Sequence, residues 1–179
     1  MGAFDYLPRY TYEEYIKWEG DWEVIDGVAY AMSPAPMIKH QSISSKIAKN
    51  LEDIFENCQH CQVLLPVDWK IKDDTIVQPD NLVICEKPTN PAYITKSPKI
   101  IFEILSKSTA NKDLHLKYDI YEKEGVNYYI IVDPDEELAK VYELYHGRYK
   151  KVCDATDDKV EFELKECKEK LIFDFSKIW

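Results

Sequence analysis

Residues 100–132 read IIFEILSKSTANKDLHLKYDIYEKEGVNYYIIV, with an apolar run at each end and a predicted helix between the two runs. The apolar run at each end lacks the alternation of a half-exposed strand, and each is predicted to be a strand buried on both faces. Between them, Ser108 or Thr109 can cap a helix that ends near Gly125. A strand, helix and strand of this length form a βαβ crossover unit, which predicts parallel strands in a sheet covered by helices.

Apolar patterning in the rest of the chain predicts a mixed sheet with helices on its faces. Trp22–Ile25 and Val28–Met32, separated by Asp26-Gly27, form a hairpin signal, and apolar residues recur at helical spacing over residues 37–57. The other predicted strands are Val63–Ile71, Ile76–Val77, Leu82–Cys85, Ala139–Leu144, Tyr149–Val152, Val160–Leu164 and Leu171–Phe173. The fold class is therefore α/β (α+β), with a mixed β-sheet core flanked by helices, an N-terminal hairpin and a C-terminal antiparallel extension. We expect a single domain over residues 1–179.

Composition and charge limit the classes of function. The chain has 179 residues, 45% of them apolar, and its 33 Asp and Glu outnumber 23 Lys and Arg to give a net charge of −10. Phosphate contacts by Lys and Arg supply most non-specific affinity for nucleic acid. Because the chain as a whole is acidic, any nucleic-acid site must be a local region of its surface. The sequence has neither a signal-peptide pattern nor the ~20 consecutive apolar residues of a membrane span, so we expect a cytoplasmic protein that binds no membrane.

The five cysteines are odd in number, and a chain of this length can bury a core unaided. Both observations argue against a disulfide framework and favour reduced thiols. Cys58-Gln59-His60-Cys61 has the spacing of a zinc-binding pair, but structural zinc takes four ligands, and no second CxxC or HxxxH pair follows. The sequence alone therefore does not predict a zinc site.

One carboxylate interrupts the first buried strand. Glu103 shares its strand face with Ile101 and Leu105, which disfavours the alternative of a glutamate facing solvent from an edge strand. Because a lone buried ion costs several kcal/mol, Glu103 needs a partner or a metal ion.

A lysine lies on the apolar face of the helix that follows. At about 100° per residue, Lys117 falls at the centre of an arc of apolar side chains, one turn after Asp113. Its side chain either snorkels along this surface to water or turns inward, and the helix alone does not decide between the two.

Asp80 lies at a kink, residues 78–81, between two short apolar runs, where aspartate is an ordinary turn residue. It can meet Glu103 and Lys117 only if the two strands are neighbours and the helix packs over them. Two converging carboxylates need a cation between them, and Mg²⁺ with its oxygen ligands is the natural candidate. With Lys117 near the nucleophile, the chemistry would be phosphodiester hydrolysis; without a metal ion, the two carboxylates could instead serve a glycosidase.

These residues also resemble a known family. VQPD at 77–80, FEILSKST at 102–109 and GVNYYIIVDP at 125–134, together with Asp113, Lys117 and Tyr121, are similar in order to the Uma family of restriction-endonuclease-like proteins in the PD-(D/E)XK nuclease superfamily. Residues 22–41 resemble the family's opening hairpin and His-bearing helix start, and FDFSKIW at 173–179 resembles its ending. The resemblance implies a mixed-sheet nuclease core with Asp80 and Glu103 as metal ligands, Mg²⁺ or alternatively Mn²⁺ as the ion, and Lys117 as the catalytic lysine.

Two further residues and one departure accompany this resemblance. His40 shares the inner arc of the long helix, where the alternative is a core histidine bonded to a backbone carbonyl. Glu23 matches the family's hairpin glutamate and would be a third acid near the metal, against the alternative of a solvated side chain. The superfamily's lysine usually stands two residues after the acidic one, where this chain has Leu105, so Lys117 on the helix must take its place.

We therefore expect a Mg²⁺-dependent endonuclease for nucleic acid, DNA in the first place, with Asp80, Glu103, Lys117, His40 and Glu23 at its catalytic site. The alternative is a non-catalytic descendant of the nuclease fold that binds DNA or a protein partner, which the net charge of −10 favours. A homodimer would supply the two centres that cutting both strands of a duplex takes.

Overall fold

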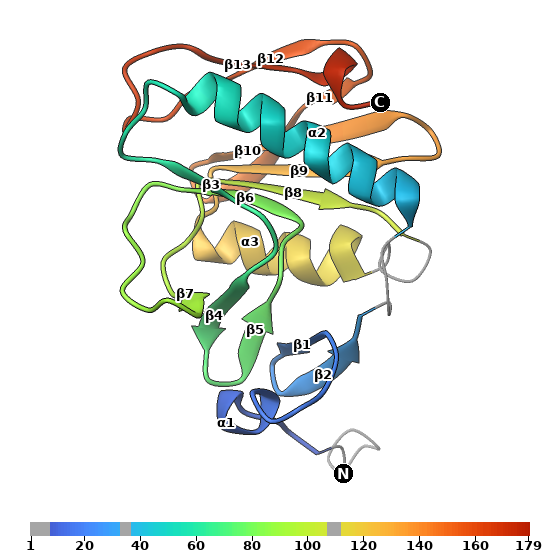
Figure 1. Ribbon diagram of the computed structural model, residues 1–179, viewed down its shortest axis with the longest axis vertical. Helices are drawn as coiled ribbons and strands as arrows, with labels where there is room; N and C mark the ends of the chain where they lie inside the picture. Colours follow the sequence, from blue (N-terminus) through green and yellow to red (C-terminus); the bar gives the residue numbers. More distant parts are fainter. Residues whose placement is uncertain (1–7, 33–36, 107–111) are drawn as a thin grey trace. The chain divides into compact units, whose positions relative to one another are not determined.

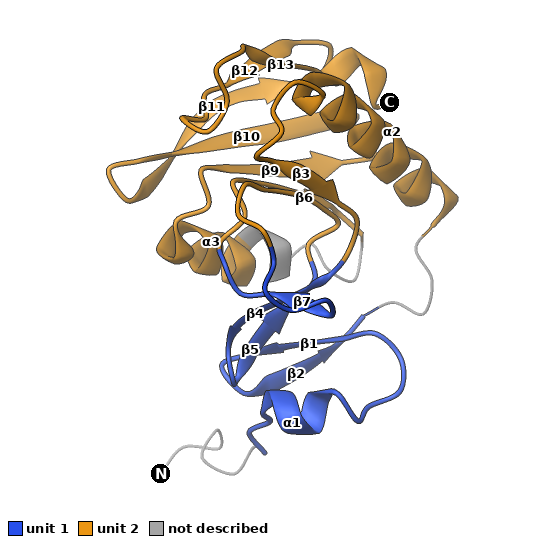
Figure 2. Cartoon of the chain, turned by 60° about the vertical axis from the view of Figure 1, so that its left-hand side comes forward, with its two compact units in different colours: residues 1–35, 67–78, 88–96 blue, residues 36–66, 79–87, 97–179 orange. Residues whose placement is uncertain are grey.

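The computed structural model describes residues 8–32, 37–106 and 112–179, and the chain groups into two compact units (Figure 2). Unit 1 comprises residues 1–35, 67–78 and 88–96, and unit 2 comprises residues 36–66, 79–87 and 97–179. The expectation of a single domain stays a prediction. No helix in the described part of the chain is long and apolar enough to cross a membrane.

Unit 1 contains a sheet with the strand order β2-β1-β5-β4-β7, in which only β4 and β7 pair in parallel. Its elements are α1 (Tyr12–Tyr15), β1 (Trp22–Ile25), β2 (Val28–Ala31), β4 (Asp68–Lys72), β5 (Thr75–Val77) and β7 (Tyr93–Ile94). The predicted hairpin is confirmed as β1 and β2. Its two turn residues, Asp26 and Gly27, have φ angles of 47° and 79°, the positive values that a tight hairpin turn of this hand requires.

Unit 2 contains a sheet with the strand order β11-β10-β9-β8-β6-β3 and a separate strand pair, β12-β13. Its elements are α2 (Ile38–Phe55), β3 (Gln62–Leu64), β6 (Asn81–Ile84), β8 (Ile100–Ile104), the π-helical turn η2 (Lys112–Lys117), α3 (Tyr118–Glu124), β9 (Tyr128–Asp133), β10 (Leu138–Tyr145), β11 (Arg148–Ala155), β12 (Lys159–Phe162), β13 (Leu171–Asp174) and the 3₁₀ turn η3 (Phe175–Lys177). Strands β8 and β9 pair in parallel, which confirms the predicted crossover unit. The helix start expected at Ser108 or Thr109 lies outside the described residues. The helix ends as predicted at Gly125, which adopts the left-handed conformation.

The two faces of the six-stranded sheet carry different helices (Figure 1). On one face, Phe102 of β8 belongs to the buried core that includes Ile43 and Ile47 of α2, and its ring lies 5.0 Å from that of Phe173 on β13. On the other face, the ring of Tyr129 lies 5.1 Å from that of Tyr121 on α3. Because side chains alternate along a strand, the residue after Phe102 points to the α3 face.

One predicted strand is wrong, and one strand of the structure was not predicted. The predicted strand Val63–Ile71 is divided into β3, which belongs to the sheet of unit 2, and β4, which belongs to unit 1. Pro66 lies between them, and it has no N–H with which to continue a strand ladder. Strand β7 was not predicted, because two residues are too few for a periodic pattern.

The expectation of reduced thiols without disulfides is also wrong for this structure. It joins Cys58 to Cys167 and Cys61 to Cys85, and leaves Cys153 on β11 as a free thiol. The odd cysteine count misleads because the fifth cysteine lies apart from the other four. Burial raises the pKa of the Cys153 thiol, as do the neighbouring carboxylates.

Candidate active site

Asp80 lies immediately before β6, at the kink that the sequence identified. Strands β6 and β8 pair with Asn81 opposite Phe102, so continuing the antiparallel register places Asp80 opposite Glu103. The carboxylate of Asp80 is fixed there, because its Oδ2 accepts a hydrogen bond of 2.8 Å from the backbone N–H of Ile104. The structure thus brings the two predicted acids to adjoining positions at the ends of neighbouring strands.

Glu103 is buried in β8, with 2% of its surface exposed. Strand β8 lies between β6 and β9, which excludes the alternative of a glutamate on an edge strand. Its Oε1 accepts hydrogen bonds from Nζ of Lys117 at 2.8 Å and from the hydroxyl of Tyr121 at 2.7 Å. The prediction that Glu103 has an inward partner is confirmed.

Lys117 is the last residue of the π-helical turn η2, directly before α3. It is 2% exposed, so the alternative of a lysine that snorkels to water is wrong. Tyr121 follows Lys117 by one helical turn, and both side chains therefore reach the same carboxylate oxygen. The position two residues after Glu103 is occupied by Leu105, and the helix supplies the lysine instead.

His40 lies in the first turn of α2, and its Nε2 is 3.3 Å from Oδ2 of Asp80. This contact is with a carboxylate, so His40 lies beside one of the predicted metal ligands. The side chains of His40 and Asp80 are 17% and 16% exposed, whereas those of Lys117 and Glu103 are 2% and 3% exposed. Solvent therefore reaches the His40 and Asp80 end of the group, while the Glu103 and Lys117 end is closed.

Glu23 belongs to unit 1, whereas Asp80, Glu103, Lys117 and His40 belong to unit 2. It is fully buried in β1, so the alternative of a solvated hairpin glutamate is wrong. Its Oε1 accepts a 2.8 Å hydrogen bond from the backbone N–H of Gln78, on the segment that leads out of β5. Its assignment as a third catalytic acid stays a prediction.

Tyr121 is the residue of this group to which the sequence assigned no role of its own. The helical projection placed it among the apolar side chains, where a tyrosine is an ordinary core residue. Its spacing of four residues after Lys117 was the available signal, because such a pair shares one helix face. The structure buries the Tyr121 ring completely and directs its hydroxyl to Glu103.

The group has the chemistry of a hard-cation site. Its carboxylates, Asp80 and Glu103, offer the oxygen ligands that Mg²⁺ and Mn²⁺ prefer. Glu103 already binds the ammonium group of Lys117, so one positive charge offsets part of the negative charge of the two carboxylates. Asp80 and Glu103 are therefore the candidate ligands for a divalent ion, and the imidazole of His40 lies beside Asp80.

The sequence matches the model of a family described as "Uma2: Putative restriction endonuclease" over residues 12–165. The chain belongs to the Uma2 family. This membership confirms the resemblance seen in the motifs and supports a nuclease-like function that acts on nucleic acid.

A solved structure has the same fold as this Uma2 protein. It is a protein from Anabaena variabilis ATCC 29413 described as "a putative nuclease belonging to DUF820". The two chains superpose with a TM-score of 0.75 at 20% sequence identity, over 94% of this chain and 96% of the other. The likeness confirms the expected α/β (α+β), restriction-endonuclease-like fold. Among curated proteins, none matches this sequence.

Proposed function

We propose that this Uma2 protein is an endonuclease that hydrolyses the phosphodiester bonds of nucleic acid, with DNA as the favoured substrate and with Mg²⁺ held by Asp80 and Glu103. The observation that carries the proposal is the placement of Asp80 beside a buried Glu103–Lys117 pair on neighbouring strands. When bound, Mg²⁺ would lower the pKa of a water molecule and stabilise negative charge on the phosphate.

The residues of the chain have separate tasks in this proposal. The N–H of Ile104 fixes the carboxylate of Asp80, which would hold the ion, and Lys117 and Tyr121 fix the carboxylate of Glu103 in position. Lys117 therefore acts as a positioning residue in the state that the structure describes. His40 is at the solvent side, where its imidazole can orient the incoming phosphate or accept a proton.

A cleavage assay tests this proposal. Supercoiled plasmid and single-stranded DNA would be incubated with Mg²⁺ or Mn²⁺ and with the wild type, Asp80→Ala or Lys117→Met. We expect cleavage by the wild type that excess chelator abolishes, and a loss of at least about 100-fold in each variant. Asp119→Asn and Lys123→Met are matched controls, because both residues are exposed on the same helix. Unchanged cleavage by both site variants would remove the assignment.

A second candidate function is supported by the closed end of the site. Nζ of Lys117 is bound to Glu103, and only 2% of the residue is exposed. A buried lysine in such an ion pair is typical of a structural role. A descendant of the nuclease fold that binds DNA or a protein without cutting would keep this pair for stability. A gel-shift assay separates the two functions, because retention of DNA without cleavage in any metal favours the binding protein.

We also infer that the active form is a homodimer, since two centres are needed to cut both strands of a duplex. Sedimentation of the purified protein measures its oligomeric state, and plasmid cleavage shows whether one or both strands are cut. A dimer that yields linear plasmid in one binding event supports the inference. A monomer that produces only nicked plasmid contradicts it.

A further inference from the structure

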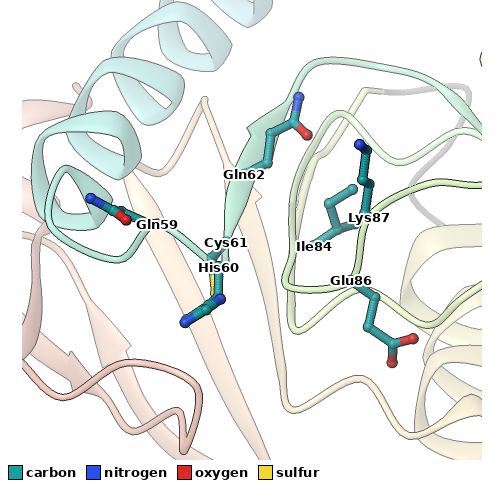
Figure 3. A pocket seen from close by; sticks show the side chains of 7 residues that line it. All are labelled: Gln59, His60, Cys61, Gln62, Ile84, Glu86 and Lys87. Carbon is teal, nitrogen blue, oxygen red and sulfur yellow. The ribbon is translucent and has the colours of Figure 1, made fainter.

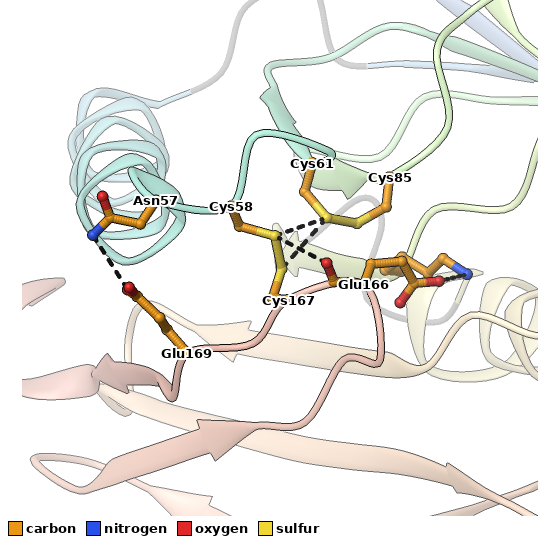
Figure 4. Close-up of a disulfide and its surroundings, with 8 residues drawn as sticks. Asn57, Cys58, Cys61, Cys85, Glu166, Cys167 and Glu169 are labelled. Atoms are coloured by element: carbon orange, nitrogen blue, oxygen red, sulfur yellow. Dashed lines mark hydrogen bonds and ion pairs between the residues drawn. A yellow bond between two sulfur atoms is a disulfide. The ribbon is translucent and has the colours of Figure 1, made fainter.

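Four cysteines gather at one place in unit 2 (Figure 4). Cys58 and Cys61 lie in the turn between α2 and β3, and Cys85 directly follows β6. Cys167 comes from the loop between β12 and β13, 106 residues after Cys61. Three separate segments of the chain therefore deliver sulfur atoms to the same point.

The sulfur atoms of the two disulfides contact each other. Sγ of Cys61 is 3.6 Å from Sγ of Cys58 and 3.6 Å from Sγ of Cys167. The Sγ atoms of these three residues all lie within 4.8 Å of one another, and Cys85 is bonded to Cys61. In a tetrahedral zinc site with Zn–S bonds of about 2.3 Å, neighbouring sulfur atoms are about 3.8 Å apart. The contacts of Cys61 with Cys58 and with Cys167 already have about this spacing.

The backbone around the cysteines also suits a metal site. In the CxxC turn, the N–H of Cys61 donates to the carbonyl of Cys58 at 3.0 Å, which holds the two residues in a tight turn. Strands β3 and β6 pair with Gln62 opposite Ile84, so continuing the register places Cys61 opposite Cys85. Three of the four thiols are thus positioned by a turn and a strand ladder that do not depend on a sulfur–sulfur bond.

The segment that carries Cys167 is held next to Cys58. The backbone carbonyl of Glu166 is 3.7 Å from Sγ of Cys58, and the Glu166 carboxylate binds Nζ of Lys99 at 2.9 Å. Lys165 and Lys168 flank this segment in the sequence. Contacts of this kind around the ligands help to orient them at a metal site.

We propose that Cys58, Cys61, Cys85 and Cys167, when reduced, bind one zinc ion as a closed structural site. The site joins the segment before β13 to the six-stranded sheet, as the two disulfides do in the oxidised protein. Conversion of the disulfide form takes four electrons and four protons, which two dithiol molecules supply by thiol–disulfide exchange as they become disulfides themselves. The four thiols then release their protons as Zn²⁺ binds.

A reductant or metal ion can reach the cluster through a pocket of about 280 Å³ (Figure 3). His60 and Cys61 line one side of this pocket, and Glu86 and Lys87 line the other. The cluster is separate from the candidate active site, because Asp80 precedes β6 and Cys85 follows it. The five residue-to-residue steps of extended chain from Asp80 to Cys85 span about 16 Å. Zinc binding therefore does not depend on the proposed nuclease function.

Metal analysis of the reduced protein tests this inference. The full chain would be purified with a phosphine reductant, zinc in the medium and no chelator, and its metal content measured by mass spectrometry. We expect about one zinc per chain in the wild type and in Cys153→Ser, and less than about one tenth of that in Cys58→Ser/Cys61→Ser. Asp80→Ala should retain its zinc, which separates this site from the carboxylates.

Cobalt substitution keeps the test valid if the double cysteine variant does not fold. Co²⁺ bound to the wild type should give a thiolate-to-metal charge-transfer band and the visible bands of tetrahedral cobalt. A reduced wild type that takes up no zinc and gives no thiolate band with Co²⁺ would overturn the proposal. Zinc retained by a folded Cys58→Ser/Cys61→Ser variant, or two disulfides that persist in the reductant, would also overturn it.

Discussion

Replacing Lys117 by methionine should strongly destabilise the fold. The ammonium lies 2.8 Å from Oε1 of Glu103, and the two side chains are 2% and 3% exposed. Removal of one partner from such a buried pair costs about 3–5 kcal/mol, because the other charge remains without compensation. Tyr121 still donates to Glu103 in the variant, so we expect a loss near 3 kcal/mol. For a chain of this length that corresponds to a decrease in Tm of roughly 6–12 °C.

A double-mutant cycle isolates the interaction. Equilibrium unfolding in urea would be measured for the wild type, Lys117→Met, Glu103→Gln and the double variant. Because the double variant buries no net charge at this place, it should regain most of the loss, within about 1.5 kcal/mol of the wild type. Lys123→Met, on the exposed side of α3, should change the free energy of unfolding by less than about 0.5 kcal/mol. A Lys117→Met variant as stable as this control would refute the buried ion pair.

Two other predictions concern tyrosine hydroxyls. Tyr121→Phe removes a hydrogen bond to the Glu103 carboxylate, so it should lower the free energy of unfolding in urea by about 1.5–3 kcal/mol; an unchanged value would contradict this contact. Burial, followed by the hydrogen bond to Glu143, raises the pKa of Tyr128 from 10.0 to about 12. Between these values the folded state holds a proton that the unfolded state has lost, so stability should fall as pH rises from 10 to 12. Tyr128→Phe should make that fall less steep, and an identical slope in both proteins would exclude Tyr128 as a cause.

The sequence predicts that Glu103 has a partner, because a lone charge is unfavourable among apolar side chains. Ile101 and Leu105 share the strand face of Glu103, and the residues on either side of it in the sequence are also apolar. A partner inside the protein was therefore the remaining way to stabilise its charge. Lys117 was the cation at the centre of the apolar face of the following helix, but the helix alone left open whether its side chain turned inward. The structure adds Tyr121. An apolar pattern counts a tyrosine as a core residue because of its ring, and it gives no information about the hydroxyl.

Long-range convergence is what the sequence does not predict. The CxxC motif was visible, but Cys85 lies 24 residues after Cys61 and Cys167 lies 109 residues after Cys58, with no spacing rule that relates them. Their meeting depends on the pairing of β3 with β6 and on the path between β12 and β13. The division of the predicted strand at Pro66 has a similar cause, because alternation continues across the point where the chain changes sheets.

The position of a bound metal ion shows whether Asp80 and Glu103 share one cation. Crystals soaked in Mn²⁺ would be measured at a wavelength where manganese scatters anomalously. We expect a peak at coordination distance from the carboxylates of both Asp80 and Glu103, and its loss in Asp80→Ala. A fully occupied manganese elsewhere in the protein, with no peak between these two side chains, would contradict it.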